Sequence, residues 1–156
     1  MIVKAEMFIR KPVEDVFEAF IDPSITRNFW FTKGSGKLET GKQIQWTWEM
    51  FNVGTQVEVK RIEKNKTILI EWGEPAVRNS VEWTFTARDE GTIVTIQNSG
   101  FRGTPDEIIQ QALDSKQGFT IVLCGLKAWL EHGIQLNLIA DHFHDAVVAG
   151  WSAVST

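Results

Sequence analysis

Tyrosine is missing from this chain of 156 residues, although the chain contains seven tryptophans and ten phenylalanines. Tryptophan and phenylalanine bury large ring areas but bring no hydroxyl groups, so any internal space that they line should be apolar rather than hydrogen-bonding. Hydrophobic residues make up 43% of the chain, an ordinary value for a folded domain that argues against disorder. At this length the simplest organisation is one domain with a substantial core.

Cysteine and histidine are scarce. Cys124 is the single cysteine, so no internal disulfide can form. We predict that it is a small packed residue, because no base that could activate a thiol stands near it in the sequence. His142 and His144 are two positions apart, which places them on one side of a strand but not of a helix, and no clear third metal ligand is nearby. We therefore expect neither a metal site nor a cofactor.

Neither a basic cluster nor a long apolar run is present, and the formal net charge is −4. The scattered basic residues argue against nucleic acid as a partner. Lys4 and Glu6 interrupt the segment in which a secretory signal would have its apolar core, and no run approaches membrane-spanning length. These absences predict a cytoplasmic protein that does not insert into a membrane.

The strongest helical pattern covers residues 115–131. Its apolar stripe recurs at spacings of three and four, as expected of a helix that buries one side. The stripe consists of Phe119, Val122, Leu123, Leu126 and Leu130. Gly118 and Gly125 interrupt this helix, each at a cost of about 1 kcal/mol relative to alanine. Because they share a face, we expect aromatic rings to approach the backbone there.

Capping signals surround this helix. Thr104 followed by a proline and then Glu107 predicts the start of a short helix that ends near residue 113. Asp114 or Ser115 is then expected to cap the long helix, and Gly133 to end it. Residues 134–156 show no clear pattern. We therefore predict one domain over residues 1–136 and a C-terminal tail of uncertain structure over residues 137–156.

Strand patterns occupy the first residues and then the middle of the chain. Residues 2–9 alternate as a strand, and apolar stripes with proline signals predict two short helices between residues 12 and 28. From residue 42 to residue 98 the hydrophobic period is two, with turns between successive short segments. Such segments form an antiparallel meander with one apolar and one wet face.

This order of elements resembles the START-like, or helix-grip, superfamily, also called SRPBCC or Bet v 1-like. Within it, the sequence resembles the AHSA1-like branch, named after the activator of Hsp90 ATPase. The resemblance covers residues 2–133. It is carried by residues 10–17, 28–31, 41–48 and 92–101, together with Asp22-Pro23 and Gly118-Phe119. The resemblance implies an α+β fold in which a curved antiparallel sheet wraps around a long C-terminal helix.

The resemblance also implies a cavity between the concave face of the sheet and the long helix. Its predicted lining is the set of inward-facing side chains: Trp46, Trp48, Val57, Val59, Ile68, Ile70, Trp72, Trp83, Phe85, Val94, Phe119, Val122, Leu123 and Leu126. Phe29 and Trp30, in an aromatic cluster before a glycine-rich loop, are predicted at its mouth or as anchors of that loop. The same rings could instead fill the interior at normal packing density.

Three functions are open from the sequence. The first is an intracellular binding protein for a small hydrophobic, aromatic or lipid-like ligand. The second is a cyclase-like or hydrolase-like enzyme that uses the same cavity. The inward positions offer no acid or base, however, because Glu49, Glu71 and Glu82 are assigned to the wet face and Asn98, on the inward side, is not titratable. We therefore predict no catalytic residue. The third is a protein-interaction module, such as an Hsp90 co-chaperone, or a homodimer formed through the tail.

Overall fold

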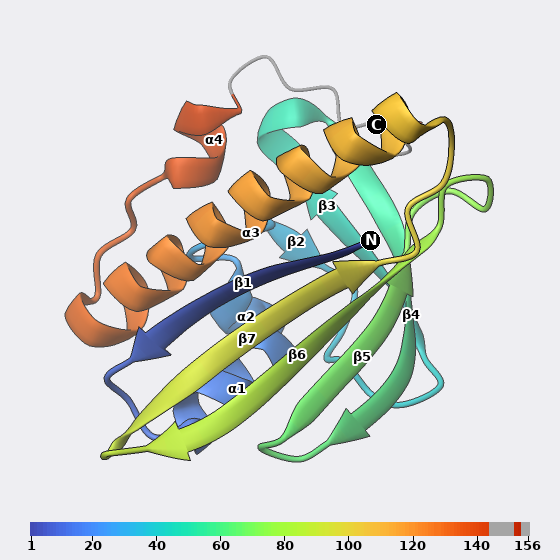
Figure 1. The fold of residues 1–156 in the computed structure, drawn as a ribbon. Coiled ribbons are helices and arrows are strands. Elements are labelled where there is room, and N and C mark those ends of the chain that lie inside the picture. The colour runs from blue at the N-terminus through green and yellow to red at the C-terminus, as the bar shows by residue number, and fades with distance from the viewer. Residues whose placement is uncertain (144–151, 154–156) are drawn as a thin grey trace.

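One curved antiparallel sheet and a long helix that crosses its face make up the fold (Figure 1). The computed structural model describes residues 1–143 and 152–153. The strands are β1 (Ile2–Ile9), β2 (Lys33–Gly34), β3 (Gln43–Trp48), β4 (Val53–Glu63), β5 (Thr67–Trp72), β6 (Asn79–Arg88), β7 (Gly91–Ser99) and β8 (Ser152–Ala153). The helices are α1 (Val13–Ile21), α2 (Pro23–Thr26), α3 (Pro105–His132) and α4 (Leu138–His142), with a 3-10 turn at Glu49–Phe51. The predicted α+β class and the two short helices after the first strand are confirmed.

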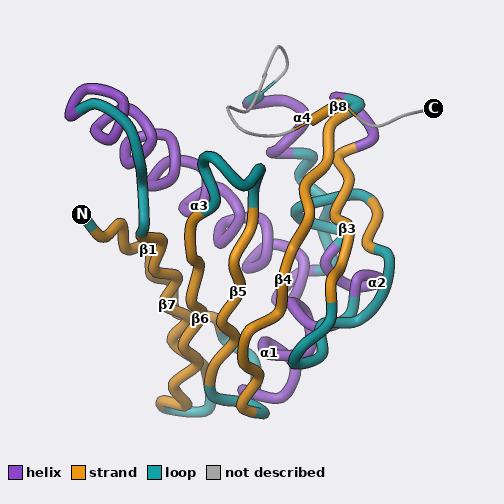
Figure 2. The backbone as a smooth tube through the Cα atoms, turned by 90° about the vertical axis from the view of Figure 1, so that its right-hand side faces the viewer, coloured by secondary structure: helices purple, strands orange, loops and turns teal. Residues whose placement is uncertain are grey.

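The strand order is β1-β7-β6-β5-β4-β3-β2, and β8 pairs with β4 outside this path. From β3 to β7 each strand pairs with the next along the chain, which confirms the predicted meander. Asp89 and Glu90 both have positive φ, as a tight two-residue hairpin turn between β6 and β7 requires. A register shift between Val59 and Arg61 bends β4 against β5. Figure 2 shows α1, α2 and α3 on the same side of the bent sheet.

Helix α3 is longer than the sequence predicted. It runs without a break from Pro105 to His132, so the expected new start at Asp114 or Ser115 is wrong. Both side chains bond outside the local backbone: Asp114 accepts from Gln110 at 3.0 Å, and Ser115 donates to Asn98 at 2.7 Å. Neither side chain therefore competes for the backbone N–H groups of the helix.

The ends of α3 agree with the prediction. The Thr104 hydroxyl accepts a hydrogen bond from the Glu107 N–H at 3.2 Å, which makes Thr104 the N-cap. Gly133 ends the helix in the left-handed region, with φ of 66°. Glycine adopts this conformation without the penalty that a side chain would bring.

The residues after Gly133 contain two elements that the sequence pattern did not reveal. α4 begins after Asn137, which has a positive φ, and its Ile139 is buried. β8 pairs with Val53 and Gly54 at the start of β4. The pairing of β4 with β5 begins only at Val57. The C-terminal segment thus returns to the sheet, and the proposed division at residue 136 stays a prediction.

Two residues lie elsewhere than expected. Cys124 is exposed, so the expectation of a packed thiol is wrong. Met50, which was expected to continue the inward alternation of the strand beginning at residue 42, lies in the 3-10 turn after β3 and is 42% exposed. The strand ends at Trp48 because the chain turns there.

Candidate ligand pocket

All fourteen side chains predicted to face inward are buried, on β3 to β7 and on α3. The sheet alternation assigned their faces correctly, since a strand has a strict side-chain period of two. Ten lie on the sheet and four on the helix that covers it, so they form the two walls of one apolar layer. That they line a ligand cavity stays a prediction.

Trp30 occupies the centre of this layer. Its exposed fraction is 6%, and its ring centroid lies 5.0 Å from that of Trp46 on the sheet and 5.9 Å from that of Phe119 on α3. Its other ring neighbours, at centroid distances up to 6.4 Å, are Phe20, Phe31, Trp48, Trp72 and Trp83. The indole from the loop before β2 therefore joins the helix to the sheet.

Phe29 is held against α3 at Gly125. A Cβ at Gly125 would lie 3.2 Å from both the Cβ and the carbonyl oxygen of Phe29. At Gly118, the nearest neighbour of such a Cβ is the ring of Phe143, at 4.0 Å. An aromatic residue thus approaches both glycines, although at Gly125 the contact is made by the backbone and Cβ of Phe29 rather than by its ring.

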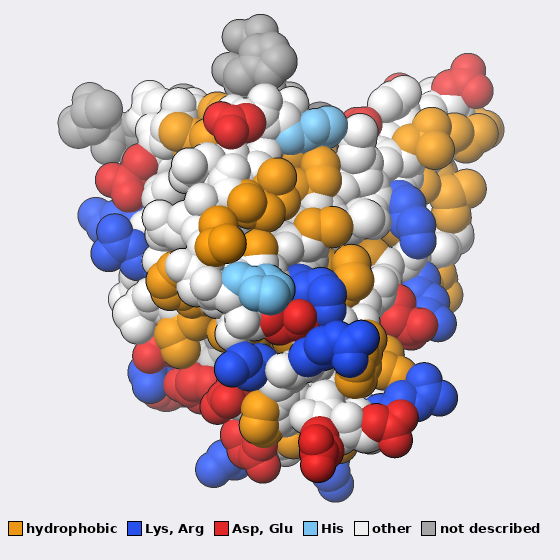
Figure 3. Space-filling view, turned by 90° about the vertical axis from the view of Figure 1, so that its left-hand side faces the viewer, with side chains coloured by type: hydrophobic (Ala, Val, Ile, Leu, Met, Phe, Trp, Pro, Cys, Tyr) orange, Lys and Arg blue, Asp and Glu red, His pale blue; other side chains and the backbone are white. Residues whose placement is uncertain are grey.

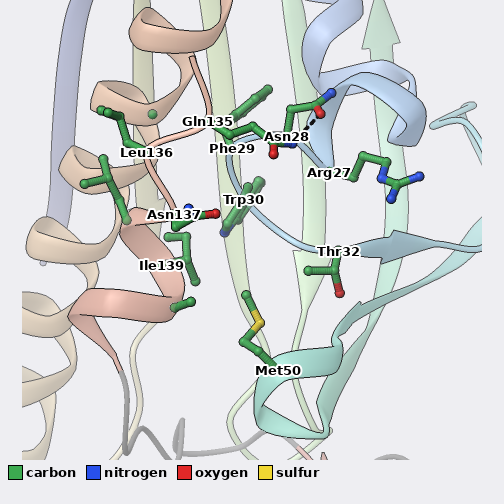
Figure 4. A pocket seen from close by; sticks show the side chains of 13 residues that line it. Arg27, Asn28, Phe29, Trp30, Thr32, Met50, Gln135, Leu136, Asn137 and Ile139 are labelled. Carbon is green, nitrogen blue, oxygen red and sulfur yellow. Dashed lines mark hydrogen bonds between the residues drawn. The ribbon is translucent and has the colours of Figure 1, made fainter. Parts of the chain in front are cut away.

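A surface pocket of about 210 Å³ opens beside Phe29 and Trp30 (Figure 4). Four parts of the chain line it: the loop after α2, the 3-10 turn at Met50, α3 at Gly125, and the segment from the end of α3 to the middle of α4. The complete lining is Arg27, Asn28, Phe29, Trp30, Thr32, Met50, Gly125 and residues 135–140. Figure 4 shows the Trp30 side chain near the middle of these residues, with Met50 and Ile139 on the side away from Phe29. One side of the Trp30 indole is therefore a wall of the pocket, while the rest packs in the interior.

The two chain segments that face each other across the pocket are connected. The Gln135 amide donates a hydrogen bond to the Asn28 side-chain oxygen at 2.6 Å, drawn as a dashed line in Figure 4. Arg27 is the one charged residue of the lining. The sequence placed Phe29 and Trp30 at a cavity mouth, which stays a prediction, and the wall formed by residues 135–140 was not predicted. The sequence contains a weak indication of this wall, since the apolar residues Leu136 and Ile139 follow the predicted end of the helix. Two apolar residues are too few to establish a helical or strand period.

The polar residue that the sequence placed inward, Asn98, closes the interior near the N-terminal half of α3. It is 3% exposed, and its amide donates to the Asn79 side chain and to the Ser80 carbonyl. Its oxygen accepts from Ser115 on α3, and the Trp72 indole N–H donates to Asn79 at 2.8 Å. This network ties β5, β6, β7 and α3 together, and it leaves Asn98 with bonds on both its donor and its acceptor side.

An ionic group fastens the other half of α3 to the end of β1. The Glu131 carboxylate, 8% exposed, accepts from the Arg10 N–H at 2.9 Å and from the Lys127 ammonium at 2.6 Å. Lys127 also donates to the Phe8 carbonyl. Burial would raise the pKa of the Glu131 carboxyl, but these donors outweigh it and hold the pKa below the ordinary value. The arrangement connects two elements that are far apart in the sequence.

Within residues 1–143, no group of three His, Cys, Asp or Glu side chains is placed to hold a metal ion. His142 lies at the end of α4, in contact with the Phe143 ring, whereas His144 is outside the described residues. In the same part of the chain no helix has both the length and the apolar character needed to cross a membrane. Most of the C-terminal tail predicted as a possible partner surface, residues 144–151 and 154–156, also lies outside the described residues.

Charges of both signs are interspersed on the face shown in Figure 3, and hydrophobic side chains gather there between two histidines. The segment that joins α3 to α4 contributes exposed apolar residues, with Ile134 at 50% and Leu136 at 46%. Ile139, in the following helix α4, is instead buried, and both it and Leu136 line the pocket. The segment therefore has one side in the pocket and one side in solvent.

The sheet and helix together define the helix-grip class of α+β domain. The chain belongs to the family described as "Activator of Hsp90 ATPase homolog 1-like protein", which matches residues 10–131. The predicted family and fold are thereby confirmed. The pocket wall formed by residues 135–140 lies outside the matched region.

Solved structures agree with this assignment. Protein SSP2350 from Staphylococcus saprophyticus is 32% identical, with a TM-score of 0.76, over 87% of this chain and 96% of that one. DynU16, from the dynemicin biosynthetic locus, is 24% identical with a TM-score of 0.75, over 86% of this chain and 48% of that one. The Aha1 dimer from Colwellia psychrerythraea is 18% identical with a TM-score of 0.73, over 85% and 98%. The last two show the fold alone. Among curated proteins, none matches this chain significantly.

Proposed function

We propose that this protein binds a small hydrophobic, aromatic or lipid-like molecule between the sheet and α3, inside the cell. The observation that carries the proposal is the position of Trp30, whose indole both lines the surface pocket and packs in the centre of the aromatic layer. A ligand that enters from the pocket takes the place of this indole. The fourteen inward side chains then become its surroundings.

The environment of Trp30 favours a ligand with rings. Trp46 on the sheet and Phe119 on α3 present ring surfaces to the position that the indole now fills. Aromatic contacts contribute about 0.5–1.5 kcal/mol per pair beyond the area that they bury, so a planar ligand recovers what the displaced indole loses. Because Trp30 stands in a loop, it can move without breaking the sheet ladder.

Family membership supports a binding role rather than a particular ligand. DynU16, whose fold is the same, belongs to a biosynthetic locus, which is compatible with a small organic molecule as a partner. The Aha1 structure is a dimer, so a second copy of the chain is a further possible partner. A cytoplasmic location is part of the proposal and can be checked by cell fractionation.

The test uses native mass spectrometry of freshly purified protein, followed by tryptophan fluorescence titration with fatty acids and planar aromatics. We expect a co-purifying molecule, or a saturable spectral change with at least one class of probe. Trp30→Ala should bind the same aromatic probes more tightly, because the ligand no longer has to displace an indole. Trp129→Ala, which removes a partly buried indole of α3 that does not line the pocket, is the matched control. Absence of binding in both the wild type and Trp30→Ala would contradict the proposal.

A further inference from the structure

Among the described residues three buried side-chain polar atoms lack a hydrogen-bond partner: Thr67 Oγ1, Arg78 Nε and Trp83 Nε1. Trp83 is the one of these three residues that is fully buried. Its side chain has an exposed fraction of 0%, and its Nε1 is a buried donor without a hydrogen-bond partner among the described residues. The Trp72 indole, on the neighbouring strand, differs because it donates to Asn79 at 2.8 Å. Leaving a buried donor unpaired is destabilising, because the group loses its hydrogen bond to water and gains no other. Buried polar groups are bonded in most proteins, so each exception calls for a specific explanation.

Trp83 adjoins the position that a ligand would occupy. It lies in the middle of β6, between Ile68 of β5 and Ile96 of β7. Its ring centroid is 6.1 Å from that of Trp30 and 6.4 Å from that of Phe119. Whatever replaces the Trp30 indole therefore lies against the Trp83 ring.

Other buried polar side chains near this layer already have partners. Asn98 bonds to Asn79, Ser80 and Ser115, and the Thr55 oxygen accepts from the Gly73 N–H at 3.1 Å. The buried polar residues of the described chain are four threonines and this asparagine, with no ionisable residue among them. A charged ligand group placed here would lose its hydration without gaining an opposite charge.

We propose that the ligand is an uncharged, planar aromatic molecule of about two fused rings, carrying a carbonyl or ether oxygen that accepts a hydrogen bond from the Trp83 indole N–H. The inference rests on the proposed function, since the molecule must take the place of the Trp30 indole. Because the ligand replaces an indole, it should have about the size of two fused rings. The surrounding aromatic rings favour a planar ligand, and the unpaired Trp83 N–H requires that the ligand carry a hydrogen-bond acceptor. The acceptor also supplies specificity, because a ligand without it leaves the donor unpaired.

The experiment compares two isosteric probes, 2-acetylnaphthalene and 2-isopropenylnaphthalene, which differ in having C=O or C=CH2. Their dissociation constants are measured by calorimetry for the wild type and for Trp83→Phe, which keeps a ring but removes the donor. Comparing the ratio of the two constants between proteins cancels differences in probe hydration and in cavity size. Trp129→Phe is the control, because it makes the same indole-to-phenyl change at a residue outside the pocket lining.

We expect the ratio of the alkene dissociation constant to the ketone dissociation constant to be about tenfold higher in the wild type than in Trp83→Phe. Trp129→Phe should give the same ratio as the wild type. The Nε1–H proton signal of Trp83 should also move downfield on binding of the ketone but not of the alkene. If both probes bind and the ratio is the same in Trp83→Phe, the acceptor inference is wrong while the proposed function stands. If neither probe binds the wild type or Trp30→Ala, both are overturned.

Discussion

At the scale of single residues, Leu126 reports whether the layer under α3 is filled. Its side chain is 0% exposed and belongs to the main core cluster. We expect Leu126→Ala to lower the free energy of unfolding by about 2–5 kcal/mol, because the removed methyl groups leave a void in a packed core. Urea denaturation measures the loss, and Leu113→Ala, at a position 61% exposed on the same helix, is the control. A loss well under about 1 kcal/mol would indicate that Leu126 borders empty space.

The second residue-scale prediction concerns Glu131. Since hydrogen bonds from Arg10 and Lys127 depress its folded-state pKa below the ordinary 4.5, its contribution is fully present above that pH. The contribution is lost as the pH falls through the folded value. We expect Glu131→Gln to cost about 1–3 kcal/mol at neutral pH, and the difference from the wild type to shrink under acid conditions.

Chemical denaturation at neutral pH and at several acid pH values measures this difference. The exposed Glu63, paired only with Arg61 at the surface, provides the control substitution Glu63→Gln, for which little change is expected at any pH. A Glu131→Gln deficit that stays constant into acid would mean that the carboxylate charge is not what stabilises the contact between β1 and α3.

At the scale of elements, the two glycines of α3 should respond differently to alanine. At Gly118 a new Cβ has room, so the gain in helix propensity, about 1 kcal/mol, should appear as added stability. At Gly125 the same Cβ would lie 3.2 Å from two atoms of Phe29, one of them in the backbone. We expect Gly125→Ala to be less stable than Gly118→Ala by at least about 1 kcal/mol in thermal or urea unfolding. Equal stabilities would show that the loop after α2 can move away from the new Cβ at little cost in free energy.

The elements also show what a sequence can predict. Inward and outward faces of β3 to β7 followed from alternation because a strand offers only two faces, and Gly133 marked the end of α3 because few residues adopt positive φ. The break expected at Ser115 did not occur, because its side chain reaches Asn98, a partner seventeen residues away. Such distant contacts have no local pattern.

The candidate site was harder to predict than the fold. Trp30 stands in a loop without periodicity, so its membership of an aromatic cluster was visible but its position at the centre of the layer was not. α4 has five residues, too few for a helical period to emerge. The position of Cys124 off the apolar stripe of α3 indicated its exposure, but the prediction followed the usual burial of cysteine instead.

At the scale of the whole molecule, the C-terminal segment should protect the pocket. Burial of Ile139 attaches α4 to the domain, and a fully buried isoleucine contributes about 1.5–3 kcal/mol. We expect Ile139→Asp to release this segment while the sheet and α3 remain folded. The result should be stronger acrylamide quenching of tryptophan fluorescence and faster hydrogen exchange at Phe29 and Trp30. Ile134→Asp, at a residue that is already half exposed, is the control.

Circular dichroism of the Ile139→Asp variant checks that its sheet and α3 remain folded. If quenching and exchange match those of the Ile134→Asp protein, then residues 135–140 do not shield Trp30 in solution. In that case the access route to the interior would be permanently open.

The stretch that the chain shares with its family stops at residue 131, whereas the outer wall of the pocket begins at residue 135. One wall of the pocket therefore lies outside the region that the family model matches, whereas Trp30 and the aromatic layer lie inside it. Under the proposed function, substitutions in residues 135–140 should change access to Trp30 while the sheet and α3 keep their fold.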